Sequence, residues 1–179
     1  MKKVILLLFL FSLTTIQLAQ SPVGKGVYTI GGNISFSSIS KENSDDSKNI
    51  FSISPRVGYF FIDNFYSAIA LSYNSTSNGD NSNSSFGFGP STRYYVDAND
   101  NVKPFLGLGY AYTIFDDADL TQSTITLSGG VDFFITKYFA IEGSLNYSFI
   151  NQNYDSGSFS KDESTNIFSL LFGANYFIN

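Results

Sequence analysis

A two-residue alternation of bulky and small side chains recurs eight times along this chain and constrains its fold more than any other feature. Near the start, Tyr28, Ile30, Ile34 and Phe36 alternate with Thr, Gly, Asn and Ser. Successive side chains of a β-strand point to opposite faces of the sheet, so a period of two predicts strands. The predicted strands cover residues 27–38, 50–61, 65–74, 85–96, 105–114, 124–133, 139–149 and 168–178.

The connections between the predicted strands alternate in length. Residues 62–64, 97–103 and 136–137 form short connections, and residues 39–49, 75–84, 115–123 and 150–165 form longer ones. The longer segments are rich in Ser, Asn, Asp and Gly, which is typical of surface loops. Short turns at one end and long loops at the other predict an all-β, eight-stranded antiparallel up-and-down barrel.

The bulky face of these strands is predicted to contact lipid. The chain has 19 Phe and 12 Tyr, and only 14% of its residues are charged, which is little for the surface of a soluble domain. A tilted strand of about ten residues crosses the apolar band of an outer-membrane barrel, which is about 25 Å tall. A soluble lipocalin-like barrel is the alternative, but its apolar side chains would face inward around a ligand.

The N-terminus has the pattern of an export signal. A basic start, Met1-Lys2-Lys3, precedes an apolar run over residues 4–13 and a small residue, Ala19. This pattern predicts a signal peptide over residues 1–19 and a barrel domain over residues 20–179. The run is shorter than the about 20 residues that a transmembrane helix needs. Without Lys2 and Lys3, 8 basic residues face 15 acidic ones, a net charge of −7, which argues against a nucleic-acid partner.

Three segments resemble a known family. The segment Pro55-Arg56-Val57-Gly58-Tyr59-Phe60-Phe61-Ile62-Asp63-Asn64-Phe65 resembles a strand, turn and strand of small outer-membrane β-barrel proteins. Residues 89–95 and 103–109 resemble the next hairpin of that family. The chain is similar to the OmpX and OmpA transmembrane-domain type, often grouped as the porin family. The resemblance covers nearly the whole chain and implies the outer membrane of a Gram-negative bacterium.

The C-terminus resembles the signal that the barrel assembly machinery reads. The residues that carry this resemblance are Gly173, Ala174, Tyr176 and Ile178. Two positions depart from the family pattern: the last residue is Asn179 rather than an aromatic residue, and Leu171 stands where a polar residue is usual. The departures bear on the efficiency of assembly more than on the fold.

Four charged residues fall on the face that is predicted to line the lumen: Arg56, Arg93, Asp132 and Glu142. Each lies a few residues from a short turn, so we expect them at a similar depth. Buried charges need partners, and two cations can neutralise two anions. We therefore expect a salt-bridge network that plugs the lower lumen; the alternative is that each charge is separately solvated in a wet interior.

The sequence offers little for catalysis or for binding a metal or cofactor. It has no histidine and no cysteine, so the usual bases and thiol nucleophiles are missing and we expect no enzymatic activity. Carboxylates cluster at Asp116-Asp117-Asp119 and Asp162-Glu163, both in predicted loops. The first group could offer oxygen ligands to calcium, but its spacing fits no EF-hand, and a solvated loop is the preferred interpretation.

Two classes of function remain. The first is a structural or interaction barrel whose extracellular loops contact lipopolysaccharide, surfaces or protein partners. The second is a narrow channel for passive diffusion of small solutes. An eight-stranded barrel has an interior just wide enough for side chains to fill, which favours the first class.

Overall fold

The computed structural model describes residues 22–40, 47–78, 81–116, 120–156 and 159–179. The predicted signal peptide and its boundary at residue 19 lie outside these ranges. Within them, no helix is long and apolar enough to cross a bilayer.

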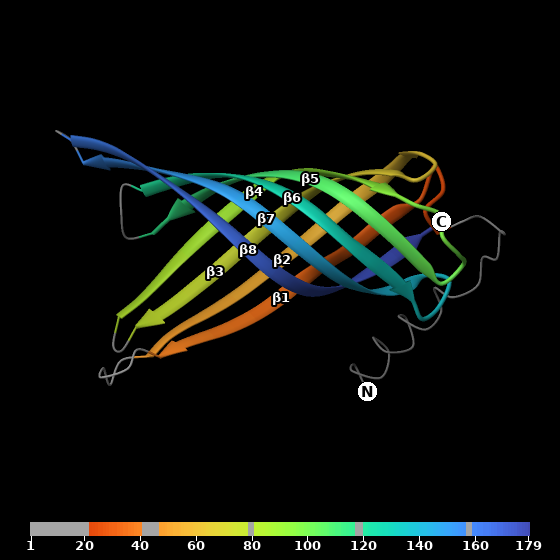
Figure 1. Cartoon of the computed structure of the whole chain (residues 1–179), viewed down its shortest axis with the longest axis horizontal. Helices are drawn as coiled ribbons and strands as arrows, with labels where there is room; N and C mark the ends of the chain where they lie inside the picture. The colour runs from red at the N-terminus through yellow and green to blue at the C-terminus, as the bar shows by residue number, and fades with distance from the viewer. Residues whose placement is uncertain (1–21, 41–46, 79–80, 117–119, 157–158) are drawn as a thin grey trace, which may run out of the picture.

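Eight antiparallel strands form a closed barrel in which each strand pairs with its neighbours in the chain and β8 pairs with β1 (Figure 1). The strands are β1 (Tyr28–Ser40), β2 (Ser47–Ile62), β3 (Phe65–Asn78), β4 (Asn81–Tyr95), β5 (Val102–Phe115), β6 (Leu120–Phe134), β7 (Phe139–Ser156) and β8 (Phe159–Ile178). The prediction of an eight-stranded up-and-down barrel is confirmed.

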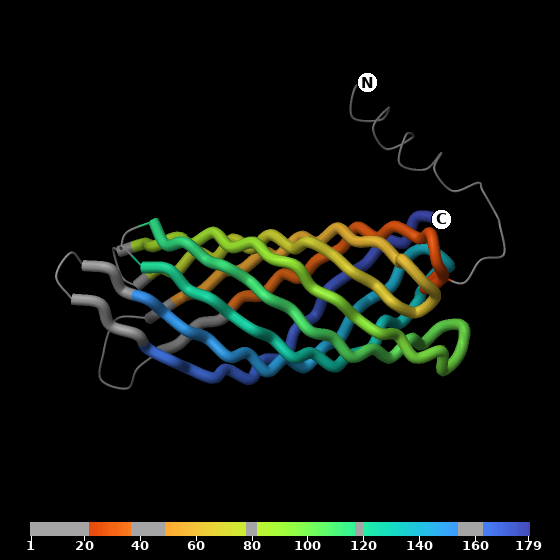
Figure 2. Tube along the Cα trace, turned by 90° about the horizontal axis from the view of Figure 1, so that it is seen from above, coloured from red at the N-terminus to blue at the C-terminus, as the bar shows by residue number. Residues whose placement is uncertain are grey.

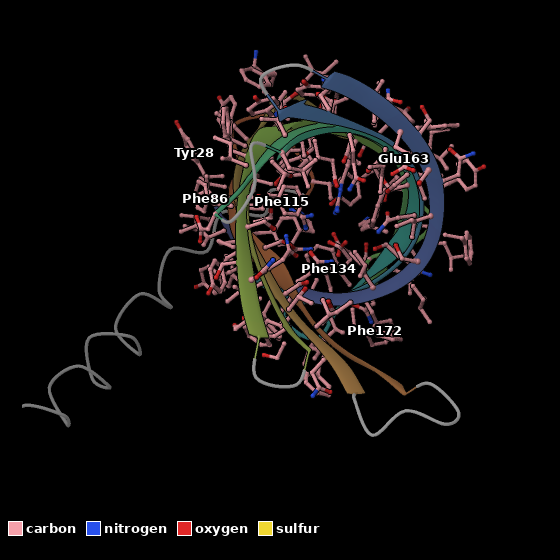
Figure 3. The ribbon with its side chains drawn as sticks, turned by 90° about the vertical axis from the view of Figure 1, so that its left-hand side faces the viewer. Tyr28, Phe86, Phe115, Phe134, Glu163 and Phe172 are labelled. Carbon is pink, nitrogen blue, oxygen red and sulfur yellow. The ribbon has the colours of Figure 1, made fainter. Side chains whose placement is uncertain are left out.

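The alternation in the sequence sorts side chains between the outside and the lumen. In β5, Leu106 is 70% exposed on the outer surface, whereas its neighbour Phe105 is 2% exposed. In the view from one end of the barrel, Phe134 lies inside the wall while Tyr28 and Phe172 point away from it (Figure 3). Bulky apolar side chains therefore cover the outer surface, the arrangement that suits a lipid environment.

The predicted long loops are wrong in extent, because paired strands occupy most of them. β1 and β2 stay paired out to Ser40 and Ser47, and β7 and β8 out to Ser156 and Phe159. The strands have 13 to 20 residues, more than the about ten that cross the apolar band. Ser, Thr and Asn mark these stretches as polar, but their backbone groups still pair across the hairpin. We call this end of the barrel the loop end.

The opposite end, which we call the turn end, carries the short connections. Asp63 and Asn64 link β2 to β3, and Asn64 adopts a positive φ of 65°, a conformation that Asn tolerates better than most residues. Residues 22–27 fold across this end, where the amide of Gly26 donates to the carbonyl of Phe60 (2.9 Å). Val23 and Val27 are fully buried there. The described chain thus starts and ends at the turn end (Figure 2).

The pairing of β1 with β8 closes the barrel over a short stretch. It runs from Tyr28 opposite Ile178 to Asn33 opposite Gly173, and the two strands diverge toward the loop end (Figure 1). Gly173 allows the close approach, because a Cβ there would lie 2.6 Å from the carbonyl oxygen of Gly32. Closure is therefore tightest in the half of the barrel next to the turns.

Candidate functional site in the lumen

Four strands bring the predicted charged residues together in the lumen. Arg56 comes from β2, Arg93 from β4, Asp132 from β6 and Glu142 from β7. All four are on the inward side of the alternation, and both carboxylates have no exposed surface. Asp132 and Glu142 are direct partners across β6 and β7, so like charges stand side by side. Such a pair needs donors from elsewhere.

Glu142 receives both guanidinium groups. Arg93 binds it in a bidentate manner, Nη1 to Oε2 at 2.8 Å and Nη2 to Oε1 at 2.9 Å. Arg56 Nη2 donates to the same Oε2 at 2.7 Å. Asn175 of β8 adds a third donor, with its Nδ2 at 2.8 Å from Oε2. The geometry resembles the strong fork-type contact between Arg and carboxylate, in a place where water is largely excluded.

Asp132 is held differently from the expected two-by-two pairing. It makes no ion pair within the described residues and accepts hydrogen bonds from two neutral groups. Tyr95 Oη donates to its Oδ2 at 2.8 Å, and Asn175 Nδ2 donates to its Oδ1 at 2.9 Å. Asn175 also accepts from Arg56 Nη2 at 2.9 Å, so its amide joins the two carboxylates and one cation. We call Arg56, Arg93, Asp132, Glu142 and Asn175 the charge cluster.

A layer of aromatic side chains lies between the charge cluster and the turn end. Its members are buried and come from β2, β3, β4, β5, β6 and β8: Phe60, Tyr66, Tyr95, Phe105, Phe134 and Phe177. Phe60 is central, with ring centroids 5.3 Å from Tyr66, 5.5 Å from Tyr95 and 6.3 Å from Phe177. Gly58 leaves room for the Tyr66 ring, which a Cβ at that position would overlap. We call this set the aromatic layer.

The two layers are coupled. The Arg93 guanidinium carbon lies 4.1 Å from the centroid of the Phe105 ring, a cation–π contact. Tyr95 belongs to the aromatic layer and donates to Asp132 of the charge cluster. The N-terminal segment then covers the aromatic layer from the turn end through Val23 and Val27. Half of the lumen is therefore packed with side chains.

The aromatic layer was missing from the predicted site, although the sequence carries a signal for it. Most of its members belong to aromatic pairs of neighbouring residues, four beside a turn and the last near the end of β8: Phe60-Phe61, Phe65-Tyr66, Tyr94-Tyr95, Phe133-Phe134 and Tyr176-Phe177. Because neighbours in a strand face opposite ways, each pair must send one ring into the lumen.

Lys103 was also missed; it is buried and forms an ion pair with Asp97 beside the turn between β4 and β5.

Small side chains line the lumen on the loop side of the charge cluster and leave a cavity of about 220 Å³. Its lining includes Ser54, Ser72, Thr126 and Ser128, and the charge cluster contributes Arg56, Arg93 and Glu142. The walls carry side-chain hydrogen bonds such as Thr126 to Ser148 at 3.0 Å. The lumen thus has a packed half and a hollow half that meet at the charge cluster.

The other predicted residues lie apart from the lumen. Asp116 is exposed at the loop end, and Asp117 and Asp119 lie outside the described residues, so the interpretation of this segment as a solvated loop stays a prediction. Among the described residues, no three carboxylates gather as a metal site. Ala174, Tyr176 and Ile178 face outward on β8, where the latter two pair with Ile30 and Tyr28 of β1.

The sequence pattern of the outer membrane protein β-barrel domain matches residues 4–117, which is more than half of the chain. The chain belongs to this family. Its location is therefore the outer membrane of a Gram-negative bacterium, as the resemblance implied. No curated protein matches the sequence.

Solved structures of small outer-membrane barrels share the fold. OprG from Pseudomonas aeruginosa is 13% identical, with a TM-score of 0.57, and the match covers 89% of this chain and 99% of that one. Outer membrane protein W from E. coli is 16% identical, with a TM-score of 0.56 over 89% and 99% of the two chains. The N-terminal barrel of P. aeruginosa OprF is 13% identical, with a TM-score of 0.52 over 87% and 99%. At these identities the likeness concerns the fold alone.

Family membership also orients the barrel. Outer-membrane barrels of this kind keep short turns in the periplasm and longer loops outside the cell. The packed half of the lumen, with the charge cluster and the aromatic layer, therefore faces the periplasm. The hollow half lies on the side of the cell exterior.

Proposed function

We propose that this protein is a barrel with a blocked lumen that acts through its extracellular hairpins and does not conduct solutes. The observation that carries the proposal is that two layers of side chains, the charge cluster and the aromatic layer, fill the periplasmic half of the lumen. Glu142, Asp132 and Phe60 have no exposed surface, and Arg93 is 7% exposed. A solute on this path would have to break the ion pairs and then displace the rings, and both steps are costly in a low-dielectric interior.

The extracellular hairpins are the surface on which we place the function. β8 has 20 residues and rises about 3.3 Å per residue, so a large part of it extends beyond an apolar band of about 25 Å. Its segment at residues 163–166, Glu-Ser-Thr-Asn, is polar and exposed. Such projecting hairpins suit contact with lipopolysaccharide, a protein or a surface. The proposal includes no enzymatic activity, since a chain without His or Cys lacks the usual catalytic bases.

The proposal extends to assembly. Gly173, Ala174, Tyr176 and Ile178 lie on β8 within its short pairing with β1. These are the residues that resemble the signal for the barrel assembly machinery. Recognition of the last strand before the barrel closes would fit their position on the closing strand.

A narrow channel is the second candidate, favoured by the cavity of about 220 Å³ on the extracellular side of the charge cluster. Liposome swelling with small sugars separates the two. We expect vesicles that contain the wild-type protein to swell no faster than empty ones. Rapid swelling would contradict a blocked lumen and support the channel.

Conductance in planar bilayers tests the filling itself. The variant Arg93→Ala removes one cation but leaves the aromatic layer, so we expect little current. Arg93→Ala combined with Phe60→Ala and Phe177→Ala should open a path and give measurable steps. Steady conductance of the wild type that none of these changes alters would contradict the proposal.

A further inference from the structure

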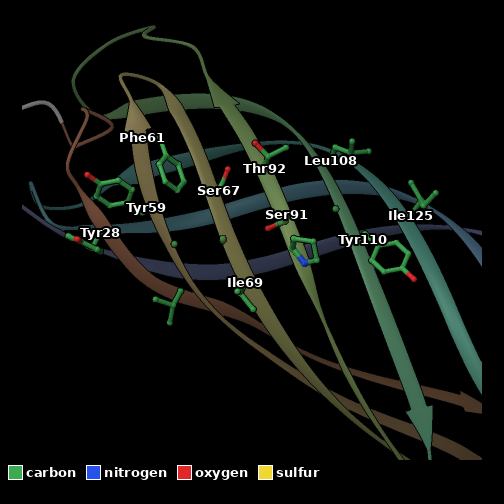
Figure 4. A pocket seen from close by; sticks show the side chains of 15 residues that line it. Tyr28, Tyr59, Phe61, Ser67, Ile69, Ser91, Thr92, Leu108, Tyr110 and Ile125 are labelled. Atoms are coloured by element: carbon green, nitrogen blue, oxygen red, sulfur yellow. The ribbon is translucent and has the colours of Figure 1, made fainter.

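A hollow of about 730 Å³ lies on the outer surface of the barrel, over β2 to β5 (Figure 4). Tyr59 and Phe61 flank it on one side, and Leu108 and Tyr110 on the other. Ser67 and Thr92 lie between Phe61 and Leu108 (Figure 4). The hollow is outside the lumen, since Tyr28, Val57, Ile69 and Leu108 in its lining are all exposed outward residues.

The strand register explains the hollow. One row of outward residues crosses neighbouring strands, and its members are Tyr28, Tyr59, Ser67, Thr92, Leu108, Leu127 and Tyr147. Five of them are large. The two small ones, Ser67 and Thr92, are direct partners across β3 and β4, so the missing side-chain volume is concentrated at one place.

The two hydroxyls differ in their hydrogen bonding. Thr92 Oγ1 donates to the carbonyl oxygen of Tyr66 at 2.9 Å. The Ser67 hydroxyl has no hydrogen-bond partner among the described residues. A hydroxyl that faces acyl chains without a partner is costly. An external group that combines apolar bulk with a hydrogen-bond acceptor would fill the hollow and pair with the Ser67 hydroxyl.

The depth of Ser67 indicates which group this is. Ser67 is two residues from Phe65, where β3 begins, and therefore about 7 Å along the strand from the turn end. Tyr28 and Tyr59 pack beside it with ring centroids 4.7 Å apart, as in the aromatic girdles at the membrane boundary. The ester groups of phospholipids lie near this boundary, and their carbonyl oxygens accept hydrogen bonds.

We propose that the hollow binds one glycerophospholipid of the periplasmic leaflet. An acyl chain packs over Ser67 and Thr92 between the walls at Tyr59 and Leu108, and an ester carbonyl accepts a hydrogen bond from the Ser67 hydroxyl. The hollow is continuous with the lipid-facing belt, so lipid reaches it directly. A twofold dimer is a poorer occupant, because such an interface places a surface against itself and would set hollow against hollow.

Native mass spectrometry of the detergent-solubilised barrel, after incubation with phosphatidylethanolamine, tests the proposal. Wild type is expected to retain one phospholipid per barrel. The double variant Ser67→Leu with Thr92→Leu fills the hollow and should lose the lipid-bound peak. Ser75→Leu is the matched control, since Ser75 faces outward on the same strand outside the hollow, and it should retain the peak. Different gel mobility of unboiled and boiled samples confirms that each variant folds.

Ser67→Ala keeps the hollow and removes only the hydroxyl, so a partial loss of bound lipid is expected even if the double variant fails to fold. Equal retention by wild type, Ser67→Ala and the double variant would overturn the proposal, as would a wild type that retains no lipid. A dimer peak that disappears in the double variant would assign the hollow to a second copy of the chain and overturn it as well.

Discussion

The two halves of the lumen share one wall of eight strands but differ in what fills them. In the periplasmic half, rings from six strands and a charge cluster from five leave almost no exposed surface. In the extracellular half, Gly, Ser, Thr and Ala dominate and a cavity remains. The backbone of an eight-stranded barrel therefore does not decide whether the lumen is blocked; the sizes of the inward residues decide it.

The largest effect should come from removing the centre of the charge cluster. Glu142→Ala leaves two buried guanidinium groups without their common partner, which we expect to lower the free energy of unfolding by about 3–5 kcal/mol. Denaturant unfolding of the barrel in phospholipid vesicles measures this. The exposed carboxylate of Asp116 offers a control, and Asp116→Ala should change stability by less than about 0.5 kcal/mol. Equal effects of the two substitutions would mean that the cluster is solvated.

The aromatic layer gives the second comparison, within a single pair of neighbours. Phe60→Ala opens a cavity among the packed rings and should cost about 3 kcal/mol in the same unfolding assay. Phe61→Ala removes an identical ring that faces outward, where lipid can fill the space, and should cost clearly less. If the outward ring proves the more costly one to remove, the assignment of Phe60 to a packed layer is wrong.

A smaller effect is expected in the hollow half. Thr126→Val removes the hydrogen bond to Ser148 and keeps the side-chain shape, so the loss should be about 1 kcal/mol or less. The matched experiment combines it with Ser148→Ala. Because both partners of the bond are then absent, the second substitution should add little, and a fully additive cost would show that the bond contributes nothing.

The smallest effect should come from a hydroxyl at the cavity wall. Ser72 lines the cavity and has no side-chain hydrogen bond among the described residues, so Ser72→Ala should change unfolding by less than about 0.5 kcal/mol. A loss above 1 kcal/mol would show that the extracellular half is packed more tightly than its cavity indicates.

The sequence predicted the wall of the barrel better than its contents. Alternation decides which way Leu106 and Phe105 point, because geometry leaves a strand residue only two sides. It also placed Arg56, Arg93, Asp132 and Glu142 in the lumen. It could not reveal that Glu142 accepts hydrogen bonds from both guanidinium groups, or that Asp132 accepts them from Tyr95 and Asn175. Partners across a lumen depend on the shear of the barrel and on the reach of each side chain. The polar composition of the hairpins led to predicted loops that are too long, because backbone groups can pair across a hairpin without apolar side chains.

Solvent access to the two halves tests the contrast most directly. The chain has no cysteine, so single cysteines can report their surroundings without background. Ser54 lines the cavity in the hollow half, and Ala140 is fully buried beside the aromatic layer. With a membrane-impermeant maleimide added to intact cells, Ser54→Cys should be labelled quickly and Ala140→Cys only after unfolding. Equal labelling of both sites in the folded protein would mean that water runs through the whole lumen. This result would contradict the proposal that the lumen is blocked.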